Sequence, residues 1–238
     1  MEKRLVQRTR GVQMAELGGV LGFWTLVGTL TVRVARFADE AADWITIGAA
    51  GIAGYLFADF LSGVFHWGGD TLGDERTPIL GPSIIATFRE HHGDPKAITR
   101  HGFLEINGAT CFASVPLLGA TAIAVPSPAR IGLFVIAFLV SSGLFGFATN
   151  QFHKWAHADS VPAVVRWLQK TGVILSPERH ARHHTPPHDG HYCITAGLLS
   201  EPLERIRFFR RLEGVIARFA PRLLRAELRP ARFDEETA

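Results

Sequence analysis

The segment Ile131–His157 reads IGLFVIAFLVSSGLFGFATNQFHKWAH, and it decides the fold. Its first part, Ile131–Thr149, is free of charged residues and long enough to cross a bilayer as a helix, which takes about 20 apolar residues. Continued helical spacing then puts Asn150, His153 and His157 on one face, one turn apart. The segment therefore predicts a membrane helix with candidate metal ligands at its end.

Three more segments have the length and apolar character of membrane spans: Met14–Val34, Trp44–Trp67 and Gly108–Pro126. The 238 residues are 47% hydrophobic with a mean hydropathy of +0.15, yet 20% are charged, so apolar spans alternate with polar segments. No small-residue cleavage site follows the first span, so we expect no signal peptide. We predict an all-α, multi-pass bundle of about four transmembrane helices with a cytoplasmic, histidine-rich helical cap.

The distribution of basic residues predicts the orientation in the membrane. An even number of crossings returns the chain to the side on which it began. Four basic residues precede the first span: Lys3, Arg4, Arg8 and Arg10. Near the opposite side we find only Arg33, Arg36 and Arg130, and the first two are expected to reach the far interface. We therefore predict that both termini and the active site are cytoplasmic. Arginine far outnumbers lysine, which favours a GC-rich genome and a bacterial inner membrane over the endoplasmic reticulum.

The stretch Glu201–Arg229 has apolar residues at helical spacing and arginines mostly on the other face. The apolar positions are Leu203, Ile206, Phe209, Leu212, Ile216, Phe219 and Leu223. This pattern predicts a basic amphipathic helix that lies on an anionic leaflet or packs against the rest of the protein. Pro221 is expected to end or kink it.

All 11 histidines lie between His66 and His191, in clusters beside the spans and on the same side of the predicted membrane. Neutral imidazoles are good ligands for iron, and two iron ions with open positions need about eight protein ligands. Asp70 and Asn150 stand one turn from a histidine and could complete the set. The predicted ligands are His66, Asp70, His91, His92, Asn150, His153, His157, His180, His183 and His184.

Several further residues lie among these clusters. The predicted hydrogen-bonding partners of the ligands, or additional ligands, are His101, Glu105, His188 and His191. Asp59 precedes His66 by seven residues on the same helical face and is expected to face the protein interior.

Other functional classes fit the sequence less well. Structural zinc takes four ligands, often cysteines, whereas this chain has only Cys111 and Cys193, which we expect to be unpaired thiols. Haem would pair histidines deep within facing spans. A Ser-His-Asp hydrolase lacks the G-x-S-x-G signal. The pI of about 9.2 reflects basic flanks of membrane spans, so no nucleic-acid partner is predicted.

Together the motifs over about residues 45–205 resemble the plasmanylethanolamine desaturase family. The matching stretches are Ala58–Phe60, His66–Trp67, Asp70–Thr71, Phe88–Pro95, Ile98–His101, Glu105–Gly108, Asn150–His157, His180–His184, Pro187–His188 and Tyr192–Thr195. Leu72, Gly102 and His191 depart from the residues usual in the family. The resemblance implies a membrane lipid desaturase domain over residues 1–200, followed at 201–238 by the amphipathic interfacial helix and tail.

The resemblance also implies the chemistry. It predicts a di-iron oxidoreductase that uses O2 to introduce a vinyl-ether double bond into the sn-1 alkyl chain of an ether phospholipid, with no catalytic group beyond the metal ligands. Electrons would come from a donor such as cytochrome b5 or a ferredoxin. Two alternatives stay open. One is a trans-3 desaturase acting on palmitate in phosphatidylglycerol, and the other is a non-catalytic membrane regulator that binds metal.

Overall fold

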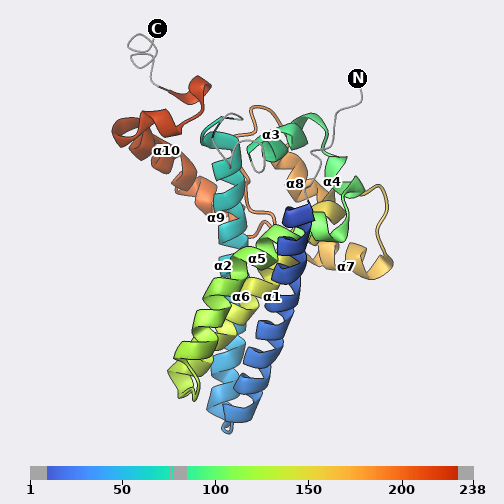
Figure 1. The fold of residues 1–238 in the computed structure, drawn as a ribbon. Helices are drawn as coiled ribbons and strands as arrows, with labels where there is room; N and C mark the ends of the chain where they lie inside the picture. The colour runs from blue at the N-terminus through green and yellow to red at the C-terminus, as the bar shows by residue number, and fades with distance from the viewer. Residues whose placement is uncertain (1–9, 75–76, 78–84, 230–238) are drawn as a thin grey trace. The chain divides into compact units, whose positions relative to one another are not determined.

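The computed structural model describes residues 10–74, 77 and 85–229, and there the regular elements are helices (Figure 1). The long helices are α1 (Arg10–Phe37), α2 (Ala41–Thr71), α5 (Phe103–Ala124) and α6 (Arg130–Ala156). The short helices are α3 (Ala86–Gly93), α4 (Ala97–Arg100), α7 (Ala163–Thr171), α8 (Pro177–His183), α9 (Ser200–Arg205) and α10 (Phe208–Phe219). Two 3-10 turns follow, η2 (Pro221–Leu223) and η3 (Ala226–Leu228). The all-α prediction is confirmed.

All four long helices have the length and hydropathy of membrane spans, and the chain is a multi-pass membrane protein. Within the most apolar 18-residue stretch of each long helix, only 22–28% is buried inside the protein. Much of the apolar surface of these helices therefore needs lipid to cover it. Each helix extends past at least one end of its predicted span. For example, α1 begins at Arg10 rather than Met14, and α6 continues to Ala156, because polar residues can prolong a helix into the headgroup region.

The chain divides into two compact units, residues 1–58 with 101–151 and residues 59–100 with 152–238. The first unit holds the larger hydrophobic core, built by α1, α5 and α6. Its most deeply buried large side chains are Phe23, Leu30, Leu118, Leu133 and Ile136.

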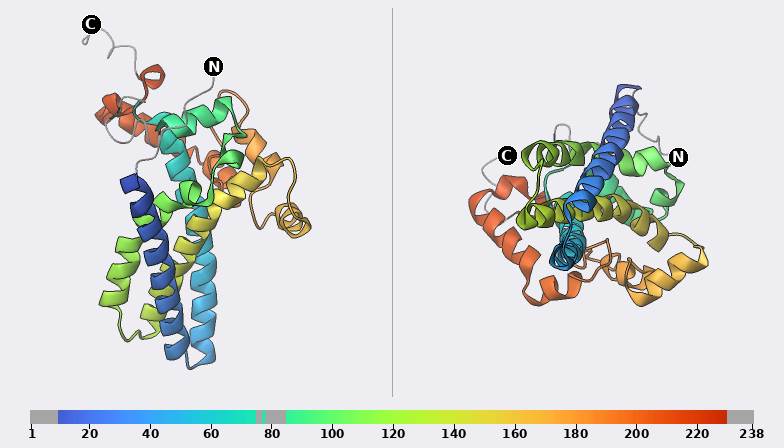
Figure 2. Two further views of the ribbon diagram at one scale, coloured as in Figure 1. Left: turned by 45° about the vertical axis from the view of Figure 1, so that its right-hand side comes forward. Right: turned by 90° about the horizontal axis from the view of Figure 1, so that it is seen from below.

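In the first unit, α1 and α5 lie side by side (Figures 1 and 2). A Cβ atom added at Gly19 would lie 2.7 Å from the backbone of Phe112, and one added at Gly108 would lie 2.5 Å from the side chain of Glu16. Lipid supplies little hydrophobic driving force between spans, so such close backbone approach through small residues is what holds membrane helices together. A side chain at Gly19 or Gly108 would separate these two helices.

Arg33 stabilises the end of α5 in this first unit. Its Nη1 donates to the carbonyl oxygens of Ala122 and Val125 at 2.7 and 2.8 Å. The last carbonyl groups of a helix have no partner within the helix, so the guanidinium satisfies groups that would otherwise be exposed to lipid.

In the second unit, Asp59 of α2 is fully buried, as expected for a carboxylate on the inner face of a span. Its oxygens accept backbone N–H groups from Ala196, Gly197 and Leu199 at 2.8–3.0 Å. The Ser62 hydroxyl accepts the N–H of Ile194. The final turns of α2 therefore anchor the segment that follows the histidine-rich region. Both cysteines are free and buried.

The C-terminal part differs from the single helix predicted over Glu201–Arg229. The helix is interrupted at Arg207, whose φ of 54° is left-handed and cannot continue an α-helix. It ends at Phe219, and Pro221 opens a 3-10 turn, as expected for a residue with no N–H to donate. Lys3, Arg4 and Arg8 and the tail at 230–238 lie outside the described residues, and the domain boundary at residue 200 stays a prediction.

Candidate metal centre

The candidate ligands in the second unit come from the ends of two long helices and from two short helices. His66 and Asp70 lie in the last turns of α2, and His153 lies at the end of α6, with His157 directly after it. The other two helices, α3 and α8, are short and lie side by side (Figure 1). The start of α8 is fixed locally, since the Ser176 hydroxyl accepts the N–H of Arg179 and Pro177 occupies the first turn.

Nine of the ten predicted ligands fall into two groups whose donor atoms lie within 4.8 Å of one another. The first group consists of His91, His153, His157, His180 and His184. The second group consists of His66, Asp70, His92 and His183. The part of the chain that the structure describes thus contains two adjacent sets of ligands, each large enough to hold one metal ion.

Helix geometry explains how the residues divide. Side chains four residues apart on a helix share a face, whereas neighbours point about 100° apart. The pairs His180 and His184, and His66 and Asp70, accordingly stay together. The adjacent residues His91 and His92 are separated, as are His183 and His184. Helices α3 and α8 each contribute to both groups.

In the first group, four Nε2 atoms face one another in a ring. His153 lies 2.9 Å from His91 and from His180, and His184 lies 3.2 and 3.0 Å from the same two. A neutral imidazole nitrogen either donates or accepts. At most two of the four contacts can therefore be hydrogen bonds. The other two bring nitrogen atoms together without a shared hydrogen, which is unfavourable when all four imidazoles are neutral.

A metal ion would resolve this conflict by accepting all four lone pairs. The Nε2 of His157 is also buried and has no hydrogen-bond partner among the described residues. The donors of the first group therefore fit a metal ion.

The second group contains further buried polar atoms without a hydrogen bond in the described part of the chain. These atoms are both ring nitrogens of His66, Oδ2 of Asp70, Nδ1 of His92 and Nε2 of His183. Oδ2 of Asp70 lies 3.5 Å from His183 and 3.8 Å from His66, and Oδ1 lies 2.9 Å from His92. Unsatisfied buried polar groups cost free energy, so this arrangement also fits a bound cation.

The orientation of His183 depends on a group that sequence reasoning missed. Its Nδ1 lies 2.8 Å from the carbonyl oxygen of Gly190, so Nδ1–H donates there and the Nε2 lone pair faces Asp70. This hydrogen bond fixes the tautomer that binds metal through Nε2. The turn at Asp189–Gly190 is visible in the sequence, but a backbone carbonyl has no sequence signature.

Burial keeps the candidate imidazoles neutral. Together with repulsion from neighbouring imidazoles, it lowers the pKa of His91 from 6.5 to about 2 and those of His183 and His184 to about 3. Burial alone lowers the pKa of His157 to about 4, and the pKa of His180 is also well below 6.5. A metal ligand must be deprotonated, so at neutral pH these side chains are ready to bind.

The other predicted residues lie outside both groups. Asn150 belongs to the first unit, where its amide donates to the Thr110 hydroxyl at 3.0 Å. His101 pairs with Glu105 at 2.7 Å. Their roles stay predictions.

The two remaining histidines contact the second unit in different ways. The ring of His188 lies 4.4 Å from that of His92, and its Nδ1 faces the carbonyl of His183. The backbone N–H of His191 donates to Glu204. His188 is thus a neighbour of the second group, whereas His191 binds Glu204 through its backbone.

These features define a multi-pass membrane protein with two adjacent histidine-rich groups suited to metal. The family model for the lipid desaturase domain matches residues 55–226. The chain belongs to this family of lipid desaturases, which are oxidoreductases.

Similar proteins come from bacteria, animals and plants. A plasmanylethanolamine desaturase of Myxococcus xanthus is 42% identical over 205 residues, covering 86% of this chain and 72% of that protein. Plasmanylethanolamine desaturase 1 of Mus musculus is 46% identical over 170 residues, covering 69% of this chain and 63% of that protein. The chloroplastic fatty acid desaturase 4 of Arabidopsis thaliana is 38% identical over 172 residues, covering 70% of this chain and 50% of that protein. No solved structure matches this chain.

Proposed function

We propose that this protein is an O2-dependent di-iron desaturase that makes the vinyl ether of plasmalogens. The observation that carries the proposal is the presence of two adjacent groups of ligands. Each group would hold one iron, the first through five imidazoles and the second through three imidazoles and the Asp70 carboxylate. Histidine and carboxylate ligands are typical of non-haem iron sites, whereas structural zinc sites often use thiolates.

In this proposal the protein's own residues bind the two irons, orient the ligands and enclose the metal-binding groups. When bound, the irons supply the oxygen activation that removal of hydrogen from an unactivated carbon requires. Burial of His66, His180 and His183 keeps water from the metal-binding groups. The carbonyl of Gly190 holds His183 in the binding tautomer. We assign no catalytic residue beyond the ligands.

The proposed substrate is a plasmanylethanolamine, because the bacterial and mouse relatives carry that name. The –CH2–CH2–O– unit of the sn-1 alkyl chain would lose two hydrogens and become –CH=CH–O–. One O2 would take these two hydrogens together with two electrons and two protons, giving two water molecules. The electrons require a separate donor, for which we propose cytochrome b5 or a ferredoxin.

The product tests this function. Cells that lack plasmalogens, given an alkyl-ether phospholipid and expressing this protein, should gain lipids that release a fatty aldehyde on mild acid treatment. Vinyl ethers are acid-labile, whereas alkyl ethers and esters release no aldehyde. Cells with an empty vector are the control.

A second candidate product is favoured by the similarity to the Arabidopsis fatty acid desaturase. A trans double bond in an ester-linked palmitoyl chain, without aldehyde release, would replace the plasmalogen proposal with this one. A protein that binds iron but changes no lipid in any expressing cell would instead be a metal-binding regulator.

We also propose that both termini and the metal-binding groups are cytoplasmic, in a bacterial inner membrane. Four candidate spans and the basic residues before the first support this topology. Reporter fusions at Met1 and at Ala238 should both report the cytoplasmic side. A reporter on the outer side at either end would overturn the topology.

A further inference from the structure

The segment from Ile206 to Leu223, which contains α10, has two different apolar sides. The inner side is formed by Phe209, Leu212 and Ile216, which pack with Trp67 and Tyr192 of the second unit. The rings of Trp67 and Phe209 stack at 5.7 Å, and Trp67 donates its indole N–H to Glu213. The apolar positions that the sequence assigns to one amphipathic face are therefore only partly available to a membrane.

A second set of apolar side chains on the same segment remains uncovered. Phe219 is 76% exposed, and Ile206, Val215 and Leu223 are each more than half exposed. On α10, the exposed side chains Val215 and Phe219 are four residues apart and so lie on one side of the helix. Large apolar side chains that gather on one face indicate an interaction site rather than ordinary surface.

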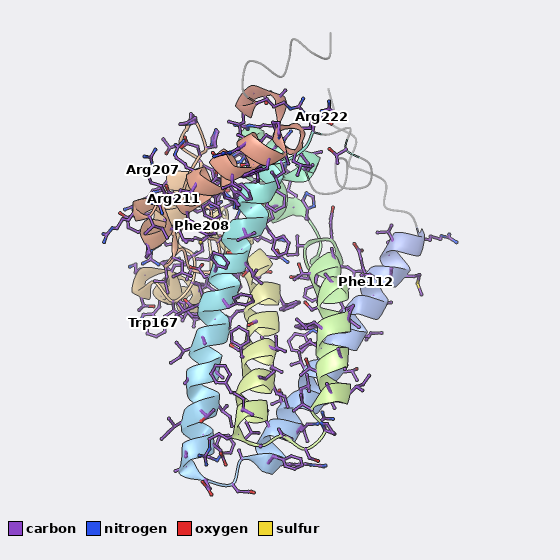
Figure 3. All side chains as sticks on the ribbon, turned by 90° about the vertical axis from the view of Figure 1, so that its left-hand side faces the viewer. Phe112, Trp167, Arg207, Phe208, Arg211 and Arg222 are labelled. Carbon is purple, nitrogen blue, oxygen red and sulfur yellow. The ribbon has the colours of Figure 1, made fainter. Side chains whose placement is uncertain are left out.

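Four arginines flank these apolar side chains: Arg207, Arg211, Arg218 and Arg222. All four are exposed, and none is ion-paired with a described residue. Figure 3 shows Arg207, Phe208, Arg211 and Arg222 along the side of this segment that faces the viewer. The guanidinium of Arg218 also lies 5.4 Å from the ring centre of Phe219. We call these arginines, with Ile206, Val215, Phe219 and Leu223, the outer face.

The acidic residues of the same region do not neutralise the outer face. Glu213 accepts from Trp67 and Glu204 accepts from the backbone of His191, so both bind within the second unit. Asp189 pairs with Arg210, and Glu201 lies 3.5 Å from Arg182. The outer face therefore combines apolar side chains with unneutralised positive charge, which is complementary to anionic phospholipids.

The place of α10 along the chain agrees with this complementarity. Its inner side packs against Val64, Trp67 and Leu72, at the end of α2. With 31 residues, α2 is longer than the roughly 20 that cross the hydrocarbon layer, so its last turns emerge at the level of the headgroups. A helix that packs on these turns lies where a membrane surface is within reach.

We propose that the outer face docks onto the anionic phospholipids of the leaflet from which the end of α2 emerges. The arginines bind lipid phosphates, and Val215 and Phe219 enter the boundary between headgroups and acyl chains. The docking would hold the second unit against the membrane surface, where its metal-binding groups meet lipid. This proposal rests on the outer face alone and does not depend on the metal or on the reaction.

The full-length protein in vesicles provides the test. In the variant Phe219→Cys, an environment-sensitive fluorophore is attached at position 219. The two native cysteines are buried and should react poorly with the label. In vesicles of phosphatidylcholine with phosphatidylglycerol, lipids spin-labelled near the headgroup should quench the fluorophore, and aqueous iodide should not. In vesicles of phosphatidylcholine alone, quenching by lipid should fall and quenching by iodide should rise.

Two controls make the result specific. The first control is Gly214→Cys. Residue 214 lies on the same helix, about 140° around the axis from residue 219, and has open space for a side chain. A label at this position should stay in water in both kinds of vesicle. Adding Arg211→Gln and Arg218→Gln to Phe219→Cys should abolish the effect of phosphatidylglycerol. Adding Arg166→Gln and Lys170→Gln on α7 removes the same charge elsewhere and should leave the effect intact.

Each alternative outcome contradicts part of the proposal. A label at residue 219 that iodide quenches equally in both kinds of vesicle would rule out membrane docking. If the label at residue 219 were equally protected from iodide in neutral and anionic vesicles, the outer face would contact the membrane through its apolar side chains alone. This result would rule out recognition of anionic lipid. Loss of the effect with the α7 substitutions as well would show a dependence on net charge rather than on the outer face.

Discussion

Replacing His180 by alanine is expected to reduce bound iron from about two ions per chain, one for each group, to one or none, and to abolish product formation. The side chain is almost fully buried, and its Nε2 faces those of His153 and His184 at 2.9 and 3.0 Å. Loss of even an outer partner of a metal ligand typically costs about 10–100-fold in affinity or activity. Loss of a central ligand should therefore cost at least about 100-fold.

Metal analysis and the lipid product measure this effect on the same purified protein. His66→Ala should act in the same way through the second group. The control is Asp159→Ala, because neither group includes Asp159, which pairs with Lys96 at the surface, and this variant should retain both irons. If His180→Ala kept full iron and activity, the first group would not be a metal site. Zinc in place of iron in the wild-type protein would overturn the di-iron proposal.

The second large effect concerns stability. Replacing Asp59 by alanine is expected to lower the apparent unfolding temperature by roughly 10 °C, which corresponds to about 3 kcal/mol or more. The carboxylate is fully buried and accepts three backbone N–H groups, from Ala196, Gly197 and Leu199. Without it these donors lose their partner in a place that water cannot easily reach, and each costs about 1–3 kcal/mol.

Thermal unfolding of the detergent-solubilised protein tests the role of Asp59. Asp159→Ala is the matched control, since this aspartate pairs with Lys96 at the surface and exposed ion pairs contribute little. An unchanged unfolding temperature for Asp59→Ala would show that the segment after Cys193 is held by other contacts. Reduced iron content in Asp59→Ala alone would be a secondary result of unfolding and would not make Asp59 a ligand.

Much of the membrane fold can be predicted from the sequence because each span is a local property. An uninterrupted apolar stretch such as Ile131–Thr149 has few alternatives to a helix in lipid. The ends of the helices are less predictable, since a polar residue such as Arg10 fits a helix or a loop equally well. The interruption at Arg207 could not be predicted, because arginine carries no preference for a positive φ.

The candidate ligands were predictable for a related reason. Spacing by four residues identifies pairs such as His66 and Asp70 directly. The division of His91 and His92 between two groups follows equally from helix geometry once α3 is known to be helical. The Gly190 carbonyl, which orients His183, could not be predicted, because its position depends on a turn packed by tertiary contacts.

The sharing of α3 and α8 between both groups also sets an order of events during biosynthesis. The first group requires His180 and His184, and the second requires His183. The second set is complete only after residue 183 and the first only after residue 184, when all four candidate spans have already been made. All four candidate spans are therefore translated before the chain could bind metal in either group, and the same short segment completes both sets almost at once.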